Sequence, residues 1–218
     1  MNELLKGVFE CLDINSNTGL ATEDDLQSMT AFQRLFFTQA HEKVGIDAIY
    51  FLRDANGIAK VPLIYFSAIQ KYDAKQVAEL HRLSWNLGEA PLLFVVTPDE
   101  IIIYNNYETP RVVESGSLDP AAGIIETLDL TNGLALQRLA LQKYHRSLLE
   151  SGEYWRQSMN RFDVQSRVDA TLMSNLRIMR RMLINQISKR CDKSKEDIAS
   201  VVHSLLSRSI FIKYLRKR

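Results

Sequence analysis

Apolar residues recur at two spacings in the first part of the chain. Over residues 2–13 and 31–43 they follow the helical repeat, and Thr30 is placed to cap the second of these helices. Over residues 46–52 and 61–69 they form continuous β-rich runs, separated by an Asp-Ala-Asn-Gly sequence that is typical of a hairpin turn. We expect the two runs to pair as antiparallel strands.

The same pattern then repeats along the chain. Asp73 is placed to begin a helix that reaches about Leu87, where Gly88 closes it. Residues 91–97 and 101–104 are two more apolar runs around a Pro-Asp-Glu turn, and they predict a second hairpin. Strands that are apolar throughout are covered on both sides. The sequence therefore predicts an α+β fold, with a mixed sheet flanked by helices.

The second part of the chain has a different character. The run from Glu153 to Arg218 contains neither glycine nor proline, which is typical of long helices. We expect helices over residues 134–149, 152–161, 168–187 and 195–218. The third of them carries apolar side chains at steps of three or four residues, a predicted core stripe made of Val168, Leu172, Leu176, Met179, Leu183 and Ile187.

The formal net charge of +1 combines two opposed parts. Residues 1–132 contain 9 Lys+Arg and 19 Asp+Glu, whereas residues 133–218 contain 18 Lys+Arg and 7 Asp+Glu. The first part therefore has a net charge of −10 and the second a net charge of +11. This division predicts two domains, an α+β domain over residues 1–132 and an all-helical, basic C-terminal domain over residues 133–218.

The composition excludes several classes of protein. With 46% apolar and 24% charged residues, the chain is too apolar for a disordered protein. It has no run of about 18 apolar residues, and its N-terminus carries acids where a signal peptide has a basic start, so we expect a cytoplasmic protein with no membrane partner. Cys11 and Cys191 lack metal-ligand spacing and are predicted to be buried thiols. The histidines are scattered too, and no metal site is predicted.

A lone acid, Asp47, opens the first strand of the predicted sheet, and Pro62-Leu63 lies near the start of the second strand. Together with the order of helices and strands, this arrangement resembles the core of the PD-(D/E)xK nucleases. The resemblance implies a restriction-endonuclease-like sheet in which an Asp on the first strand meets a Glu-x-Lys on the second. In that family the carboxylates hold a divalent cation and the lysine orients or activates water.

The Glu and the Lys of that motif fall on Ser67 and Ile69, and neither residue can replace them. Asp47 alone cannot hold and charge-balance Mg²⁺, because such sites need further carboxylates or phosphate oxygens. We therefore predict a nuclease-like sheet that does not cleave DNA, with Asp47 either a vestigial catalytic residue or an ordinary acid at a strand edge. An active Mg²⁺-dependent nuclease would need relocated acids, for which the candidates are Glu10, Glu42 and Asp54.

The helical part carries a second resemblance. The sequences RFDV at residues 161–164, RVDATLMSNL at residues 167–176 and VHSLLSRSIFIKYL at residues 202–215 resemble the helical region that precedes the catalytic domain of large bacterial adenine-specific DNA methyltransferases. In restriction–modification proteins of this kind, a nuclease-like region, a helical connector and a methylase domain share one chain. The two resemblances together cover about residues 30–218 and imply the N-terminal region of such a protein, with a role in bacterial defence.

The chain lacks the chemistry of a methylase itself. It has no Pro-Pro sequence for the target amine and no glycine-rich turn for S-adenosylmethionine. We therefore expect no cofactor in this part, and we expect S-adenosylmethionine to bind only in a methylase domain in cis. Because the chain stops within a predicted helix, we expect it to continue beyond Arg218 in a longer parent protein.

Basic side chains gather on the predicted helices around residue 180, opposite the core stripe. They are Arg177, Arg180, Arg181, Lys189 and Arg190. One interpretation is an ordinary solvated helix face. The net charge of +11 favours the other, contact with the phosphates of double-stranded DNA, in which case the affinity falls as salt is added.

Three functional hypotheses follow. The preferred one is a DNA-binding and scaffolding module of a restriction–modification DNA methyltransferase. The second is a metal-dependent DNA endonuclease that uses Asp47 with relocated acids. The third is a protein–protein adaptor whose acidic half binds a basic partner surface or masks the basic half of the chain.

Overall fold

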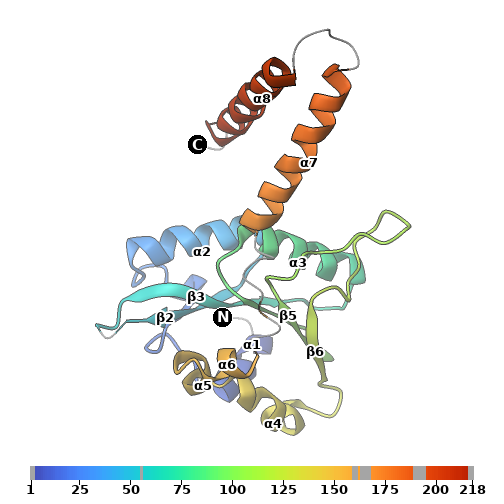
Figure 1. Ribbon diagram of the computed structural model, residues 1–218. Helices are drawn as coiled ribbons and strands as arrows, with labels where there is room; N and C mark the ends of the chain where they lie inside the picture. Colours follow the sequence, from blue (N-terminus) through green and yellow to red (C-terminus); the bar gives the residue numbers. More distant parts are fainter. Residues whose placement is uncertain (1–2, 55, 159–161, 163–167, 189–194, 216–218) are drawn as a thin grey trace. The chain divides into compact units, whose positions relative to one another are not determined.

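The structure is a computed structural model that describes residues 3–54, 56–158, 162, 168–188 and 195–215 (Figure 1). It divides into two compact units, Met1–Arg167 and Val168–Arg218. The described residues of the first unit form a six-stranded sheet with helices, and those of the second form a pair of helices.

All strands of the described residues belong to one sheet, whose spatial order β1-β2-β3-β4-β5-β6 is also their order along the chain. They are β1 (Leu20–Thr22), β2 (Ala48–Arg53), β3 (Ala59–Ala68), β4 (Leu92–Val96), β5 (Glu100–Asn105) and β6 (Ile124–Asp129). β3 and β4 run parallel, and the other neighbouring pairs are antiparallel. The sheet is therefore mixed, and both predicted hairpins, β2–β3 and β4–β5, are confirmed.

Two long helices, α2 (Ala31–Val44) and α3 (Ala74–Leu87), cover one face of the sheet (Figure 1). Thr30 caps α2, because its hydroxyl oxygen accepts a hydrogen bond from a backbone amide of the first turn at 3.2 Å. Asp73 caps α3 in the same way, at 2.8 Å. Such caps satisfy amide groups that have no partner within the helix. Both predicted helix starts are confirmed.

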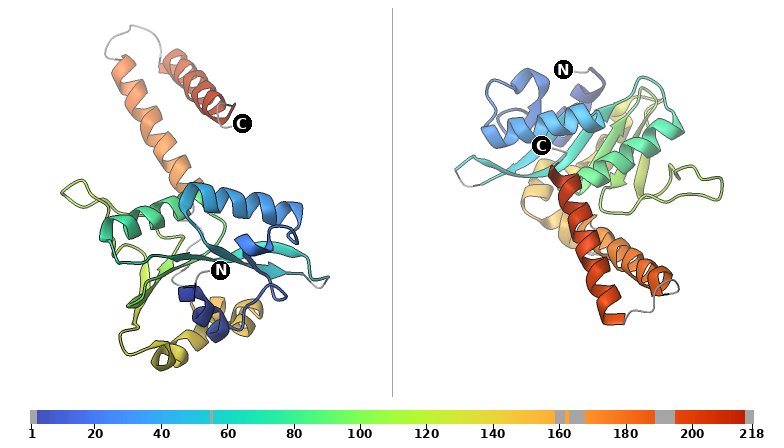
Figure 2. Two further views of the ribbon diagram at one scale, coloured as in Figure 1. Left: turned by 180° about the vertical axis from the view of Figure 1, so that it is seen from behind. Right: turned by 90° about the horizontal axis from the view of Figure 1, so that it is seen from above.

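Helix α1 (Glu3–Leu12) and a series of short helices cover the other face (Figure 2). The short helices are η2 (Leu134–Gln137), α4 (Arg138–Leu141), η3 (Gln142–Tyr144), α5 (Arg146–Glu150) and α6 (Glu153–Gln157); a further short helix, η1 (Glu23–Asp25), follows β1. The single helix predicted over residues 134–149 is wrong. His145 has a ψ angle of 141°, which interrupts the helical path, and its ring nitrogen accepts a hydrogen bond from the Ser147 amide at the start of α5.

Each face of the sheet has its own apolar layer. Phe37 of α2, Val77 of α3 and Tyr65 of β3 are buried together in the layer on one face. On the other face, the Tyr144 ring meets Phe94 of β4 edge to face, with the ring centroids 5.3 Å apart. Cys11 is buried in this second layer, as predicted, and Cys191 lies outside the described residues.

The short helices after residue 133 thus belong to the core of the first unit. The sequence predicts a domain boundary between residues 132 and 133, whereas the division into two compact units falls between residues 167 and 168. The net charge changes sign near residue 133, but burial continues: Leu141, Tyr144, Leu149 and Tyr154 all lie in the apolar layer beneath the sheet. Charge is a property of the surface, and it does not report where a core ends.

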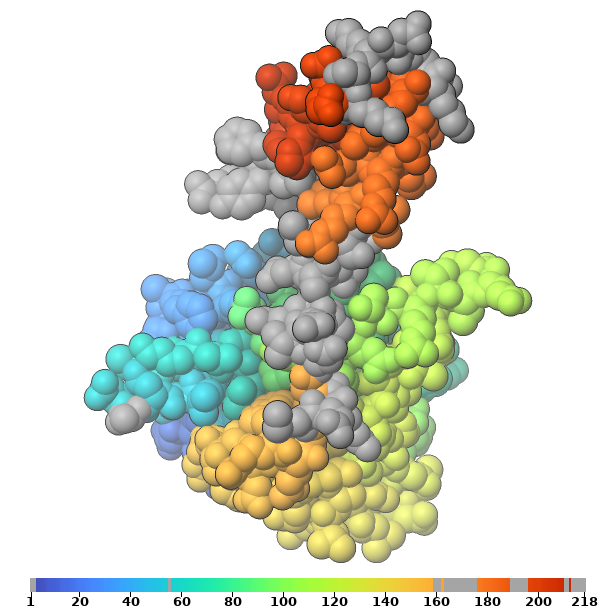
Figure 3. All heavy atoms as spheres, viewed as in Figure 1, coloured from blue at the N-terminus to red at the C-terminus, as the bar shows by residue number. Residues whose placement is uncertain are grey.

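The connection between β5 and β6 projects from the surface of the first unit, where Figure 3 shows it in yellow-green. Val112 and Leu118 form an isolated antiparallel bridge within it, and the Gly116 amide donates to the Val113 carbonyl at 2.9 Å. Val112 and Val113 are exposed at its tip. Along the chain, this projection lies between β6 and β5, the strand with which β6 pairs.

In the second unit, α7 (Val168–Ser188) and α8 (Lys195–Leu215) lie side by side and run antiparallel (Figures 1 and 2). Ile198 and Val202 of α8 are buried. Of the predicted core stripe, Leu183 and Ile187 are half-buried, but Met179 is 50% exposed. Within the described residues, no helix combines the length and the apolar character that a membrane-spanning segment needs.

Candidate functional site

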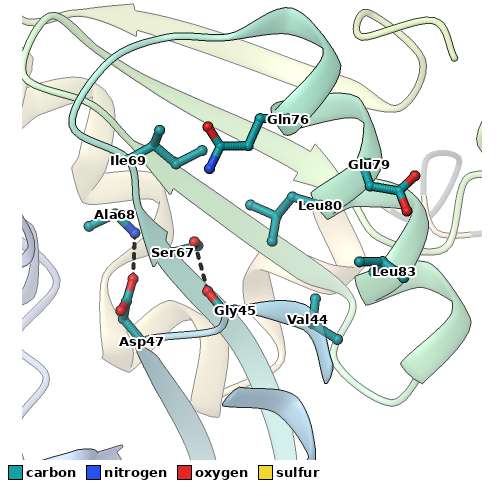
Figure 4. A pocket seen from close by; sticks show the side chains of 10 residues that line it. All are labelled: Val44, Gly45, Asp47, Ser67, Ala68, Ile69, Gln76, Glu79, Leu80 and Leu83. Atoms are coloured by element: carbon teal, nitrogen blue, oxygen red, sulfur yellow. Dashed lines mark hydrogen bonds between the residues drawn. The ribbon is translucent and has the colours of Figure 1, made fainter. Parts of the chain in front are cut away.

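Asp47 lies between the end of α2 and the start of β2, beside the end of β3 (Figure 4). Gly45, whose φ angle is 84°, ends α2 in the left-handed conformation, and the chain then turns into the sheet. The Asp47 amide donates to the Phe66 carbonyl at 2.8 Å, and the Asp47 carboxylate accepts from the Ala68 amide at 2.7 Å. The backbone of β3 thus holds both the main chain and the side chain of Asp47.

The positions aligned with the Glu and the Lys of the nuclease motif come to the same place. Ser67 and Ile69 line the same pocket as Asp47, because β2 and β3 are antiparallel neighbours (Figure 4). The Ser67 hydroxyl donates to the Gly45 carbonyl at 3.0 Å, and Ile69 is buried and apolar. The three positions therefore line one pocket, and they supply a single carboxylate.

A second acid, Glu79 of α3, lines this pocket of about 280 Å³. Figure 4 shows it at the opposite end from Asp47, while Gln76 points its amide toward the middle. The Arg82 guanidinium donates to Glu79 at 2.8 Å, and this pairing holds the pKa of the Glu79 carboxyl below its usual value. Glu79 is thus engaged with a cation of its own helix and does not complete a pair of carboxylates with Asp47.

On its other side, Asp47 borders a smaller pocket of about 100 Å³, to which Glu23, Asp24 and His41 also contribute. His41 Nδ1 lies 2.8 Å from the Ile46 carbonyl oxygen, which can only accept, so Nδ1 is the donor in this contact. Nowhere in the described part of the chain do three or more His, Cys, Asp or Glu side chains come together as a metal site would require.

The acids proposed as relocated ligands do not join Asp47. Glu10 and Glu42 are exposed on α1 and α2. Asp54 belongs to the β2–β3 turn, where it accepts hydrogen bonds from the Ile58 and Asn56 amides at 2.9 Å each; these bonds lower the pKa of its carboxyl. None of the three lines either pocket beside Asp47.

Arg177, Arg180 and Arg181 are exposed on α7. None of them forms an ion pair with a carboxylate in the described ranges of the chain. Their spacing of three and one residues places them within about one helical turn of each other. Lys189 and Arg190, the other two predicted DNA contacts, lie outside the described residues.

A buried polar cluster that the sequence did not predict lies between α3 and the sheet. His81 is 1% exposed and stacks on Tyr104, with the ring centroids 4.7 Å apart. Nearby, the Ser84 hydroxyl donates to the Asn106 side chain at 2.6 Å. Burial lowers the pKa of His81 to about 4, and the Asn105 backbone acts in the opposite direction. His81 is therefore neutral at pH 7, and its ring packs in the core of the first unit.

The described geometry contains one anchored carboxylate between two small pockets and one exposed group of arginines. Neither feature by itself identifies a protein family. The chain matches no protein-family model, no curated protein and no solved structure.

Proposed function

We propose that this chain is a DNA-binding and scaffolding module, the N-terminal region of a restriction–modification adenine-specific DNA methyltransferase, with a nuclease-like sheet that does not cleave DNA. One observation carries the proposal. The three positions aligned with the nuclease motif line one pocket, and they hold Asp47, Ser67 and Ile69, of which only Asp47 has a carboxylate. In this proposal S-adenosylmethionine binds to a methylase domain in cis, and the protein works in the cytoplasm.

The arginines of α7 supply the proposed contact with double-stranded DNA. A guanidinium carries a permanent charge and matches the geometry of a phosphate group. Arg177, Arg180 and Arg181 are exposed and have no acidic partner among the described residues, so they are available to phosphates. Contacts of this kind are independent of DNA sequence and weaken with salt.

Replacing Arg177, Arg180 and Arg181 together by glutamine is expected to weaken binding to a DNA duplex on the order of 10- to 100-fold at low salt. The slope of log K against log salt should fall by about 0.9 for each phosphate that the variant no longer neutralises. Fluorescence anisotropy with a labelled duplex, titrated at several salt concentrations, measures both quantities.

A matched variant removes the same charge elsewhere. Arg111, Arg138 and Arg156 are exposed residues of the first unit, and replacing them by glutamine should change the affinity much less. Equal losses of affinity in both triple variants would show that the net charge of the chain, and not the position of the α7 arginines, determines DNA binding. Undetectable binding of the wild-type chain at low salt would end the proposal.

The proposed loss of cleavage is tested with plasmid DNA and either MgCl₂ or MnCl₂. We expect no nicking above background. Asp47 supplies the one carboxylate among the three aligned positions, and one of its oxygens accepts a hydrogen bond from the Ala68 amide. The control is Asp47→Asn, which keeps an oxygen acceptor for that amide and removes the charge. Nicking by the wild-type chain that disappears in Asp47→Asn would establish the metal-dependent nuclease instead.

A further inference from the structure

A further pocket of the first unit has a volume of about 380 Å³ and shares no described lining residue with the two pockets beside Asp47. Pockets that hold small molecules begin at about 300 Å³. Strand β3, the loop before β4, the turn after β5 and helix α6 contribute to its lining, together with Phe162. It is here called the aromatic pocket (Leu63, Glu89, Pro91, Tyr107, Trp155 and Phe162).

Three aromatic side chains line the aromatic pocket. The rings of Trp155 and Phe162 have centroids 5.1 Å apart and planes at 76° to each other, so they form a corner. The Trp155 indole N–H donates to the Leu149 carbonyl at 3.1 Å, and the indole therefore offers its carbon surface to a ligand. Tyr107 adds a third ring, and its hydroxyl donates to the Glu89 carbonyl at 3.2 Å. The faces of aromatic rings carry partial negative charge.

Glu89 adds a full negative charge to this lining. It is exposed and takes part in none of the ion pairs between described residues. No lysine, arginine or histidine is found among the described residues that line the pocket. Of the basic residues close to the lining in sequence, Lys60 is paired with Asp54 at 3.3 Å, and Arg156 is exposed on α6. The described lining thus combines ring faces with one carboxylate.

A ligand that matches this lining is cationic and carries apolar groups. Ring faces attract a cation that lies within about 6 Å of the ring centre. A bare ammonium group would lose water against the buried Leu63 and Pro91 without gaining hydrogen bonds in return, whereas a methylated ammonium group needs fewer of them. A nucleotide is disfavoured, because residues 1–167 contain 15 Lys+Arg and 22 Asp+Glu, a net charge of −7 that repels phosphates.

We propose that the aromatic pocket binds a methylated ammonium group, with the methyl groups against the rings of Tyr107, Trp155 and Phe162 and the positive charge beside Glu89. A trimethylammonium group occurs in small molecules such as choline and in the side chain of trimethylated lysine, and its recognition is the same in both. This site is independent of the proposed DNA contact, because the α7 arginines belong to the second unit.

The test compares choline with 3,3-dimethylbutan-1-ol, the neutral molecule of the same shape in which carbon replaces the nitrogen. Each is titrated with the full chain, and saturation transfer to its methyl protons is followed by NMR. We expect choline to bind at least fivefold more tightly than the neutral molecule, because only choline gains from the ring faces and the carboxylate. Equal binding of the two molecules would reveal an ordinary apolar pocket and overturn the proposal.

A second arm of the titration separates the two sources of the group. It uses the N-acetyl methylamide of trimethyllysine. Tighter binding of this compound than of choline would identify a modified side chain as the ligand, and tighter binding of choline would identify a free small molecule. The proposal fails if neither compound binds.

Two variants at position 155 isolate the contribution of the aromatic ring. Trp155→Leu and Trp155→Phe both lose the hydrogen bond to the Leu149 carbonyl, but only Trp155→Phe keeps a ring face. We expect choline binding to weaken about tenfold in Trp155→Leu and less than about threefold in Trp155→Phe. Equal affinities of the two variants would contradict a role of the ring. Circular dichroism checks that both variants keep the helix content of the wild type.

The carboxylate is tested with Glu89→Gln, which keeps the shape of an exposed side chain and removes its charge. Choline binding should weaken about two- to fivefold, as for other exposed charge pairs. Glu114→Gln is the matched control, since Glu114 is exposed and is not among the residues that line the pocket. Equal losses in Glu89→Gln and Glu114→Gln would mean that the overall charge of the unit attracts choline, and the proposed site would be wrong.

Discussion

Replacing Tyr144 by alanine is expected to lower the free energy of unfolding of the first unit by about 3–5 kcal/mol, as for other large buried aromatic residues. Tyr144 is fully buried and packs against Phe94 of the sheet and Tyr154 of α6, with ring centroids 5.3 and 5.2 Å away. Its removal leaves a cavity between the sheet and the short helices. Urea unfolding followed by the fluorescence of Trp85 and Trp155 measures the decrease in stability.

Tyr144→Phe is the matched control, because it keeps the ring and its packing. We expect it to change the free energy of unfolding by less than about 1 kcal/mol. The pair of variants also tests the domain boundary. If Tyr144→Ala changed the unfolding of the sheet by less than about 1 kcal/mol, residues 134–157 would not belong to the core of the sheet, and the predicted boundary between residues 132 and 133 would stand.

Acid should destabilise the first unit through His81, by up to about 3 kcal/mol between pH 6.5 and pH 4. Burial lowers the pKa of His81 from its ordinary value of 6.5 to about 4 in the folded chain. Between these values the unfolded chain binds a proton that the folded chain does not, so stability falls as the pH falls. Above about pH 6.5 this contribution is complete and constant.

The variant His81→Gln removes the titrating group. Its absolute stability will differ from that of the wild type, because the stacking on Tyr104 changes. The quantity to compare is the slope of the unfolding free energy against pH, measured by urea titrations from pH 7.5 to pH 4.5. We expect a shallower slope in His81→Gln over this range, and identical slopes would show that His81 is not the group responsible.

The sequence predicted the central elements of the fold because their signals are local. Strands β2 to β5 are apolar runs bounded by turn residues, and the caps at Thr30 and Asp73 lie next to the helices that they begin. The two edge strands lacked such signals. β1 has only three residues, and its partner β2 lies beyond the whole of α2. β6 follows the long projection after β5 and is only partly buried.

The candidate site was predictable only in part. The resemblance points to Asp47, Ser67 and Ile69, and these residues line one pocket because β2 and β3 are neighbours. Glu23, Asp24 and His41 reach Asp47 from η1 and α2, and only tertiary packing places them there. The exposed methionine at position 179 shows a further limit, since helical periodicity marks a stripe as apolar and does not say which part of it finds a partner.

The strand order has a consequence for how the first unit forms during synthesis. Each strand pairs with its neighbour in sequence, so the strands can be added to the sheet in the order of translation, without waiting for a strand made later. The apolar layer beneath the sheet cannot be completed at that stage, because the residues that cover Phe94 lie after position 133 and are made later than the sheet. A nascent chain that has completed its sheet therefore still presents an open apolar face, and it will be most prone to aggregation, or to capture by chaperones, until residues 134–157 have been made.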